Sequence, residues 1–134
     1  MLDVLSIHST SSSRELRFEK LDGNHFVVEL SGHAPNVRLE VWEFPDGPKL
    51  LEFFEKLGSY SLPWSREESW SSLEGEFGIS ASCTSSGHVL FKVNLRGLPG
   101  SPEEWHVSAG ITSALGQLPT IVSAARAVFL VVQA

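Results

Sequence analysis

The stretch VRLEVWEFPDGPKLLEFFEKLGS, residues 37–59, contains the change of hydrophobic period that decides the fold. In residues 37–44 apolar and polar side chains largely alternate, which is typical of a strand with one buried face. The apolar residues that follow have the spacing of one helical stripe, and they are Leu50, Leu51, Phe53, Phe54 and Leu57. Asp46 is suited to the N-cap of this helix, Pro48 to its first turn and Gly58 to a left-handed C-cap.

Alternation with a period of two recurs on both sides of this stretch and predicts further strands near residues 4–7, 14–20, 25–30, 70–82, 89–95 and 105–111. The segment GQLPTIVSAARAVFL, residues 116–130, has a second helical stripe, although its tail FLVV is also compatible with a strand. We therefore predict one α+β domain over residues 1–134. One antiparallel sheet of about six or seven strands would carry both helices on its apolar face.

Composition narrows the class of protein. The chain has 134 residues, a net charge of −6 and a single cysteine, so we expect a globular domain with no internal disulfide. Its overall field repels nucleic acid, and no Lys/Arg cluster opposes that field. Its start, MLDVLSIHS, lacks the features of a signal peptide, and no apolar run is long enough to span a membrane. We expect a cytoplasmic protein that binds neither nucleic acid nor membrane.

The stretch ASCTSSGHVLFKVNL, residues 81–95, places the only cysteine near a histidine. A nucleophilic Cys83 with His88 as its base is one interpretation. Neither an orienting acid nor a helix N-terminus is evident beside Cys83, and both flanks alternate. A β-hairpin that turns around residues 84–87, with Gly87 at its positive-φ position, is the better prediction.

Other chemistry-bearing residues fall on the polar faces of predicted strands. Glu74 and Glu76 share one face of the predicted strand 70–82, at a separation that resembles some glycosidase pairs. His88 and His106 share the polar parity of two neighbouring strands, so a small enzyme or metal-binding domain that uses them and nearby carboxylates is an alternative hypothesis. We assign no catalytic, cofactor-binding or metal-ligating residue and expect no cofactor.

The same polar faces also suit a protein partner. Trp42 has the parity of the charged residues of its strand, and an aromatic residue on an acidic face is a common interface anchor. The predicted partner-binding residues are Trp42, Glu40, Glu74, Glu76, His88 and His106.

The C-terminal half resembles a bacterial family of small uncharacterised proteins, a domain of unknown function with a W-x-x-L…G-H-V…G-Q-L pattern. The residues that carry the resemblance are Trp70, Leu73, Ala81, Gly87, His88, Val89, Val93, Leu95, Trp105, Gly116, Gln117 and Leu118. The family pattern often has an acidic residue where Thr84 stands and another where Ala114 stands, and this chain departs from it at both. The resemblance implies a compact α+β bacterial domain and carries no activity with it.

Size, acidity and the lack of catalytic motifs favour a protein-binding function. Our leading hypothesis is a small bacterial protein that neutralises a partner by direct binding, such as an immunity protein for a toxin. Besides the enzyme or metal-binding domain, a structural or oligomerising domain is a further alternative, because the sequence does not determine the oligomeric state.

Overall fold

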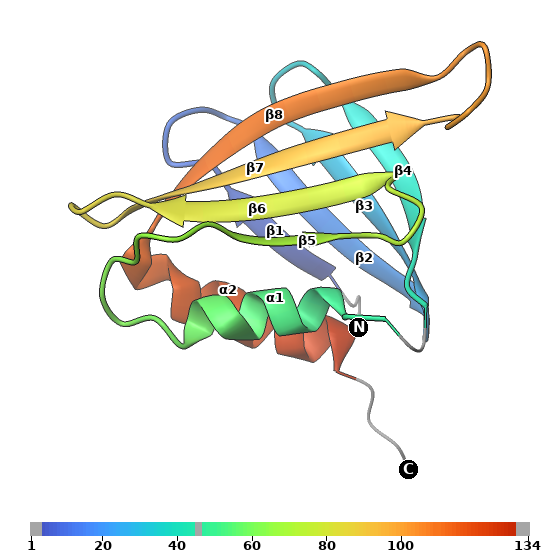
Figure 1. Ribbon diagram of the computed structural model, residues 1–134. Coiled ribbons are helices and arrows are strands. Elements are labelled where there is room, and N and C mark those ends of the chain that lie inside the picture. Colours follow the sequence, from blue (N-terminus) through green and yellow to red (C-terminus); the bar gives the residue numbers. More distant parts are fainter. Residues whose placement is uncertain (1–3, 45–46, 131–134) are drawn as a thin grey trace.

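Two four-stranded antiparallel sheets face each other, and two helices lie along one side of the space between them (Figure 1). The computed structural model describes residues 4–44 and 47–130. The N-terminal sheet consists of β1 (Val4–His8), β2 (Glu15–Asp22), β3 (His25–Ser31) and β4 (Val37–Trp42), in that spatial order. The C-terminal sheet consists of β5 (Glu68–Ser71), β6 (Phe77–Cys83), β7 (His88–Gly97) and β8 (Trp105–Ala114), also in chain order. The helices are α1 (Leu50–Gly58) and α2 (Leu118–Phe129), the latter preceded by the short 3₁₀ helix η1 (Leu115–Gln117).

The prediction of a single sheet of six or seven strands is wrong, although the α+β class is right. The physical reason is the width of the apolar surface. Eight strands about 4.8 Å apart would form a sheet about 34 Å wide, whereas two helices about 10 Å in diameter cover about 20 Å. The chain solves this by breaking the sheet at α1, between β4 and β5, so that the two apolar faces cover each other.

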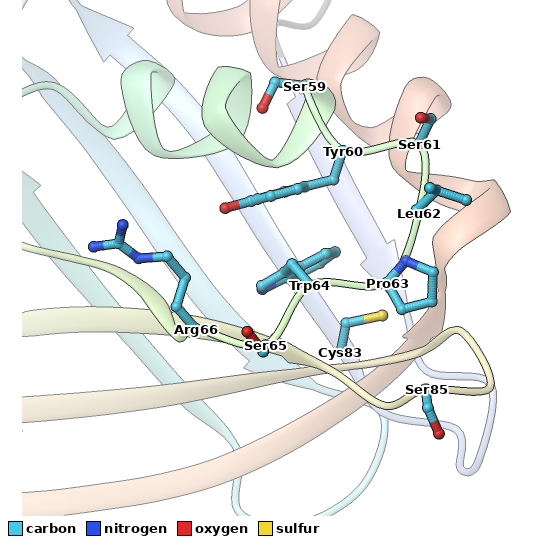
Figure 2. A pocket seen from close by; sticks show the side chains of 10 residues that line it. All are labelled: Ser59, Tyr60, Ser61, Leu62, Pro63, Trp64, Ser65, Arg66, Cys83 and Ser85. Carbon is cyan, nitrogen blue, oxygen red and sulfur yellow. The ribbon is translucent and has the colours of Figure 1, made fainter.

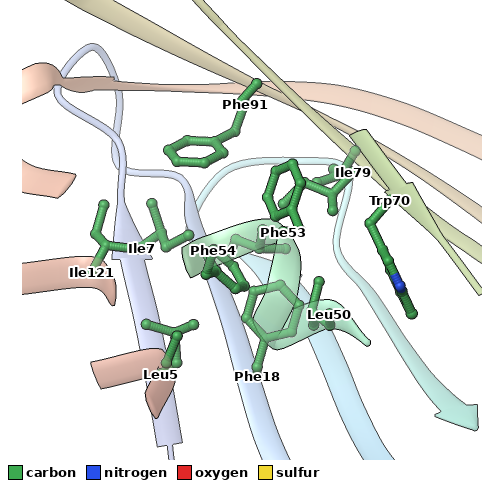
Figure 3. Close-up of a cluster of buried hydrophobic side chains, with 14 of the residues drawn as sticks. Leu5, Ile7, Phe18, Leu50, Phe53, Phe54, Trp70, Ile79, Phe91 and Ile121 are labelled. Carbon is green, nitrogen blue, oxygen red and sulfur yellow. The ribbon is translucent and has the colours of Figure 1, made fainter. Parts of the chain in front are cut away.

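One hydrophobic core joins both sheets and both helices (Figure 3). Phe18 of β2 lies at its centre and contacts the rings of Phe26, Phe54, Phe77 and Phe129 at centroid distances of 5.7–6.1 Å. These four rings come from β3, α1, β6 and α2. The core therefore combines contacts between the two sheets with contacts from both helices.

The first helix follows its predicted stripe, but its ends differ from the prediction. All five residues of the apolar stripe are buried. The helix begins after Lys49, so Pro48 precedes it, and Asp46 lies outside the described residues. Gly58 is the last helical residue and has no left-handed conformation. A Cβ there would lie 3.1 Å from the side chain of Val122, so close packing on α2 explains this glycine.

The predicted strand over residues 70–82 is a hairpin. Strand β5 ends at Ser71, and the N–H of Ser72 donates to the carbonyl of Phe77 at the start of β6. Gly75 provides the positive φ of the turn, 75°. Leu73, expected on the apolar face, is therefore a turn residue with 75% of its surface exposed. The alternation of the sequence does not reveal this turn, because Leu73 stands an even number of residues before Phe77. It therefore continues the apolar pattern of β6.

The C-terminal helix and the hairpin around residues 84–87 are confirmed. Helix α2 has Pro119 in its first turn and continues to Phe129, so the start of the FLVV tail is helical; residues 131–134 lie outside the described part. Gly87 has a φ of 87°, and its N–H donates to the carbonyl of Thr84. Neither helix of the described residues is long and apolar enough to cross a membrane.

The two sheets are tied together by polar bonds where β1 and β8 meet. The β1–β2 turn, residues 9–14, lies against β8, and the N–H of Thr10 donates to the carbonyl of Thr112 at 3.0 Å. The hydroxyls of Ser9, Thr10 and Ser11 lie 2.6–3.3 Å from the hydroxyl of Thr112. Arg14 donates to the carbonyls of Gly110, at 2.8 Å, and Ala34, at 3.0 Å. We call this region the closed corner.

Candidate functional site

The opposite side of the molecule, where β4 and β5 are the edge strands, has an apolar groove. The groove has a volume of about 340 Å³. Its lining residues come from the end of β4, the segment before α1, β5 and the β5–β6 turn, and they are Trp42, Glu43, Phe44, Gly47, Pro48, Trp70, Ser71 and Leu73. We call this set the aromatic groove. Three large apolar side chains in it are exposed: Trp42 by 51%, Phe44 by 42% and Leu73 by 75%. Such a gathering on a surface marks an interaction site more often than it marks chance.

Trp42 is exposed but held in place by a histidine. The rings of Trp42 and His25 are stacked, with centroids 3.6 Å apart and planes 7° apart. The two residues are direct cross-strand partners on the outer face of the N-terminal sheet. The His25 side chain is only 11% exposed, so it forms the floor on which the indole lies. Trp42 therefore loses little conformational freedom when another molecule covers it.

Carboxylates surround this stack. Nε2 of His25 lies 2.9 Å from Oε1 of Glu40, and Nδ1 lies 3.7 Å from Oδ2 of Asp22. Both carboxylates remain more than half exposed. The rim of the groove beside Trp42 is therefore acidic.

Two hydrogen bonds fix the walls of the groove. Oε2 of Glu43 accepts the N–H of Leu50 at 2.7 Å and so caps the first turn of α1. Nε1 of Trp70 donates to the carbonyl of Pro48 at 2.9 Å. Glu43 and Pro48, two lining residues of the groove, are thus each bonded to a buried residue.

The predicted partner-binding residues do not form one surface. Trp42 and Glu40 lie together on β4, and Glu74 follows Leu73 of the groove in the β5–β6 turn. Glu74 and Glu76 were expected on one face of a strand, and this is wrong because Gly75 turns the chain between them. The glycosidase-like pair therefore has no basis in the fold.

Glu76 and His106 belong to a row of charges on the outer face of the C-terminal sheet. The N–H of Arg96 donates to the carbonyl of Glu76, and Arg96 is the cross-strand partner of His106. His106 lies 2.7 Å from Glu104. The N–H of Gly100, which donates to Glu104 at 2.6 Å, and then the His106 side chain hold the pKa of Glu104 below its usual value.

His88 lies at the other end of the same sheet. It pairs with Ala114, eight residues along β7 from the Arg96–His106 pair, which corresponds to about 26 Å. The structure therefore does not bring His88 and His106 together in one site. Nδ1 of His88 contacts the hydroxyl of Ser86 in its own turn. Within the part of the chain that the structure describes, no three His, Cys, Asp or Glu side chains gather as a metal site requires.

Cys83 and His88 do not form a catalytic pair. Cys83 has the core-facing parity of its strand, packs at the edge of the core and donates to the carbonyl of Thr84 at 3.4 Å. His88 is exposed and follows the turn. The hairpin interpretation of residues 81–95 is the correct one.

A second hollow of about 690 Å³ lies between the α1–β5 connection and the end of β6. Figure 2 shows the ring of Tyr60 above the indole of Trp64, with Cys83 below; the two rings are stacked at 4.6 Å. Tyr60 donates a hydrogen bond to Glu68, and this bond raises the pKa of Tyr60. Trp64 is buried, so both aromatic residues mainly close the core here. This hollow opens broadly to solvent, and Leu62 is its one strongly exposed apolar side chain among the described residues.

Sequence reasoning missed three residues of the aromatic groove region. His25 has the outward parity of β3, but its place opposite Trp42 depends on the register of the β3–β4 connection. Phe44 is two residues beyond Trp42 and shares its parity, a signal that could have extended the predicted surface. Leu73 was expected in the core because the alternation places it in a strand.

Together, the fold and the groove define a small two-sheet α+β domain with an exposed aromatic surface between β4 and β5. The chain belongs to a family of unknown function, DUF6228, whose model matches residues 7–131. This family extends over nearly the whole chain and not only over its C-terminal half. Comparisons with curated proteins and with solved structures gave no match.

Proposed function

We propose that this chain is a bacterial, cytoplasmic protein-binding domain that neutralises a basic partner protein, in the manner of an immunity protein for a toxin. The partner binds at the aromatic groove. The observation that carries the proposal is the Trp42–His25 stack, because it presents a large aromatic side chain that is half exposed and already fixed. Rigid, exposed Trp residues are the side chains that most often dominate binding energy at protein interfaces.

Charge supports a basic partner. Asp22 and Glu40 lie beside the stack, and the chain as a whole has a net charge of −6. Complementary charge steers association and disfavours partners of the same sign. An apolar centre formed by Phe44 and Leu73 would bury an aliphatic or aromatic side chain of the partner.

Site-specific photo-crosslinking in the native cells tests the proposal. A photoreactive residue is introduced at Leu73 in one variant and at Leu62 in another. These residues are matched controls, since they are 75% and 74% exposed and lie in different hollows. We expect one protein to be crosslinked from position 73 and not from position 62. Equal crosslinking from both positions, or from neither, would contradict the proposed site.

The crosslinked protein is then purified and its affinity measured by titration calorimetry. We expect Trp42→Ala to weaken binding by about tenfold to a hundredfold, as for an interface hot spot, and Leu62→Ala to leave it unchanged. Coexpression tests neutralisation: the partner should arrest growth alone and not together with the wild-type chain. A partner that binds at the groove but is harmless would retain the docking site and exclude the immunity function.

A further inference from the structure

We infer that β4 is a homodimerisation strand: its free edge pairs with β4 of a second copy in antiparallel orientation, with the two-fold axis at Leu39. This inference does not rest on the proposed partner at the aromatic groove, although Glu40 takes part in both. It depends on the backbone of β4 and on the side chains of Arg38 and Glu40.

The other edge strands of the two sheets have neighbours. Strands β1 and β8 meet at the closed corner through the Thr10–Thr112 backbone bond, and α1 lies beside β5 (Figure 1). Strand β4 approaches β7 of the other sheet, but its backbone pairs only with β3 in the described part of the chain. Natural proteins protect such edges with charged side chains, Pro or a bulge. Strand β4, with the sequence VRLEVW, has an unbroken register without Pro or bulge, and its two charged residues, Arg38 and Glu40, have opposite signs.

The direction of the free backbone groups follows from one hydrogen bond. The N–H of Glu43 donates to the carbonyl of Asn24, at 2.7 Å, across the β3–β4 pair. In an antiparallel ladder the residues that bond to a given neighbour are two apart. Val41, Leu39 and Val37 therefore bond toward β3. Arg38 and Glu40 direct their N–H and C=O groups to the open edge.

Only one symmetric register gives opposite charges across that edge. With the axis at Leu39, Arg38 of one copy exchanges both backbone bonds with Glu40 of the other, and this occurs twice. An axis at Arg38 would place arginine opposite arginine, and an axis at Glu40 would place glutamate opposite glutamate. Both side chains are exposed and lie on the outer face, where they can reach the second copy; Glu40, which lies 2.9 Å from Nε2 of His25, would then contact Arg38 of that copy as well.

The inner face of the edge agrees with this register. Val37 and Leu39 are only partly buried, although they pack against the core. In the paired edge Leu39 faces Leu39 of the second copy, and Val37 faces Val41. A six-residue edge is a small interface, so we expect a dimer that forms and dissociates readily and is best seen in a concentration series.

Sedimentation equilibrium on the full chain tests the inference with two charge reversals, Arg38→Glu and Glu40→Arg. The wild type should change from monomer to dimer as its concentration rises. Each variant alone should dimerise about tenfold more weakly or worse, since both cross-strand pairs become repulsive. An equimolar mixture of the two variants should form dimers again. The Arg38→Glu variant has acidic residues at positions 38 and 40, and the Glu40→Arg variant has basic residues at both, so the two edges attract each other. Both variants keep a negative net charge, so attraction between their net charges does not explain a recovered dimer.

Arg17→Glu is the matched control, because it makes the same charge change on the same sheet face but on β2, away from the edge. Leu73→Ser is the control for the aromatic groove. Both should dimerise like the wild type, and circular dichroism should show that every variant is folded. A wild type that stays monomeric at all concentrations, or a mixture that recovers no dimer from two weakened variants, would overturn the inference. So would a loss of dimer in either control.

Discussion

The two places where the sheets come together differ in chemistry. At the closed corner, Arg14 and the serine-rich turn bond to β8 with directional hydrogen bonds. At the opposite side, β4 and β5 have an apolar groove between them, and its exposed tryptophan, Trp42, lies on a histidine and faces solvent. Both sides share one core. We therefore expect the closed corner to contribute mainly to stability, and we propose that the open side is the one that binds.

The largest effect is expected for Phe18→Ala, because this change removes the ring that contacts both sheets and both helices. We expect a loss of about 3–5 kcal/mol in the free energy of unfolding, as for other buried Phe→Ala changes. Urea unfolding measures it. A loss of less than about 1 kcal/mol would show that the two sheets do not share a core.

Arg14→Ala tests the closed corner alone. It removes two hydrogen bonds from a charged donor, and we expect a cost of about 2 kcal/mol in the free energy of unfolding. Binding at the aromatic groove should be unchanged in the folded protein. Arg17→Ala is the control, because Arg17 also lies on β2 but its side chain has no hydrogen bond or ion pair within the described part of the chain. Equal costs for the two variants would contradict the role of the corner.

Trp42→Ala tests the open side. The side chain is half exposed, so we expect a stability cost of no more than about 1 kcal/mol, mainly from the lost stack on His25. Trp70→Ala makes the same chemical change in the same groove, but Trp70 is buried and should cost about 3–5 kcal/mol. Thermal or urea unfolding distinguishes them. A large loss for Trp42→Ala would make this residue part of the core and remove the case for a binding role.

The smallest expected effect concerns Tyr60, whose hydroxyl attaches the α1–β5 connection to Glu68 of β5. It is the only tyrosine of the chain, so ultraviolet titration of the phenol reports on it directly. We expect its midpoint to lie above that of free tyrosine and to fall toward the ordinary value in Glu68→Ala. Because the folded pKa is raised, the contribution to stability is complete below the ordinary tyrosine pKa, about 10, and is lost as pH rises through the folded pKa. An unchanged midpoint in Glu68→Ala would exclude this bond.

Local patterns predicted the elements well. Alternation identified the inner and outer residues of β4, the helical stripe identified the buried face of α1, and the Ser/Gly run identified the turn before β7. These patterns depend only on residues that are close in the chain, so they can be recognised in the sequence alone.

The arrangement of the elements was harder to predict. Alternation shows which residues of a strand are buried, but it does not show whether they face a helix or another sheet. Glu74 and Glu76 were misplaced because Leu73 continued the strand parity into a turn. Trp42 and Glu40 were correctly placed on one outer face. The position of His25 beside them could not be predicted, because it follows from the pairing register of β3 and β4, which the sequence does not reveal.

Residue-resolved amide hydrogen exchange at low protein concentration tests most directly whether the two sides differ as described. The N–H of Thr10, bonded across the closed corner, should exchange slowly. The N–H groups of Arg38 and Glu40, which point to the free edge of β4, should exchange fast, while that of Leu39 between them is protected. Fast exchange at Thr10, together with Arg38 and Glu40 as protected as Leu39, would contradict a molecule that is closed on one side and open on the other.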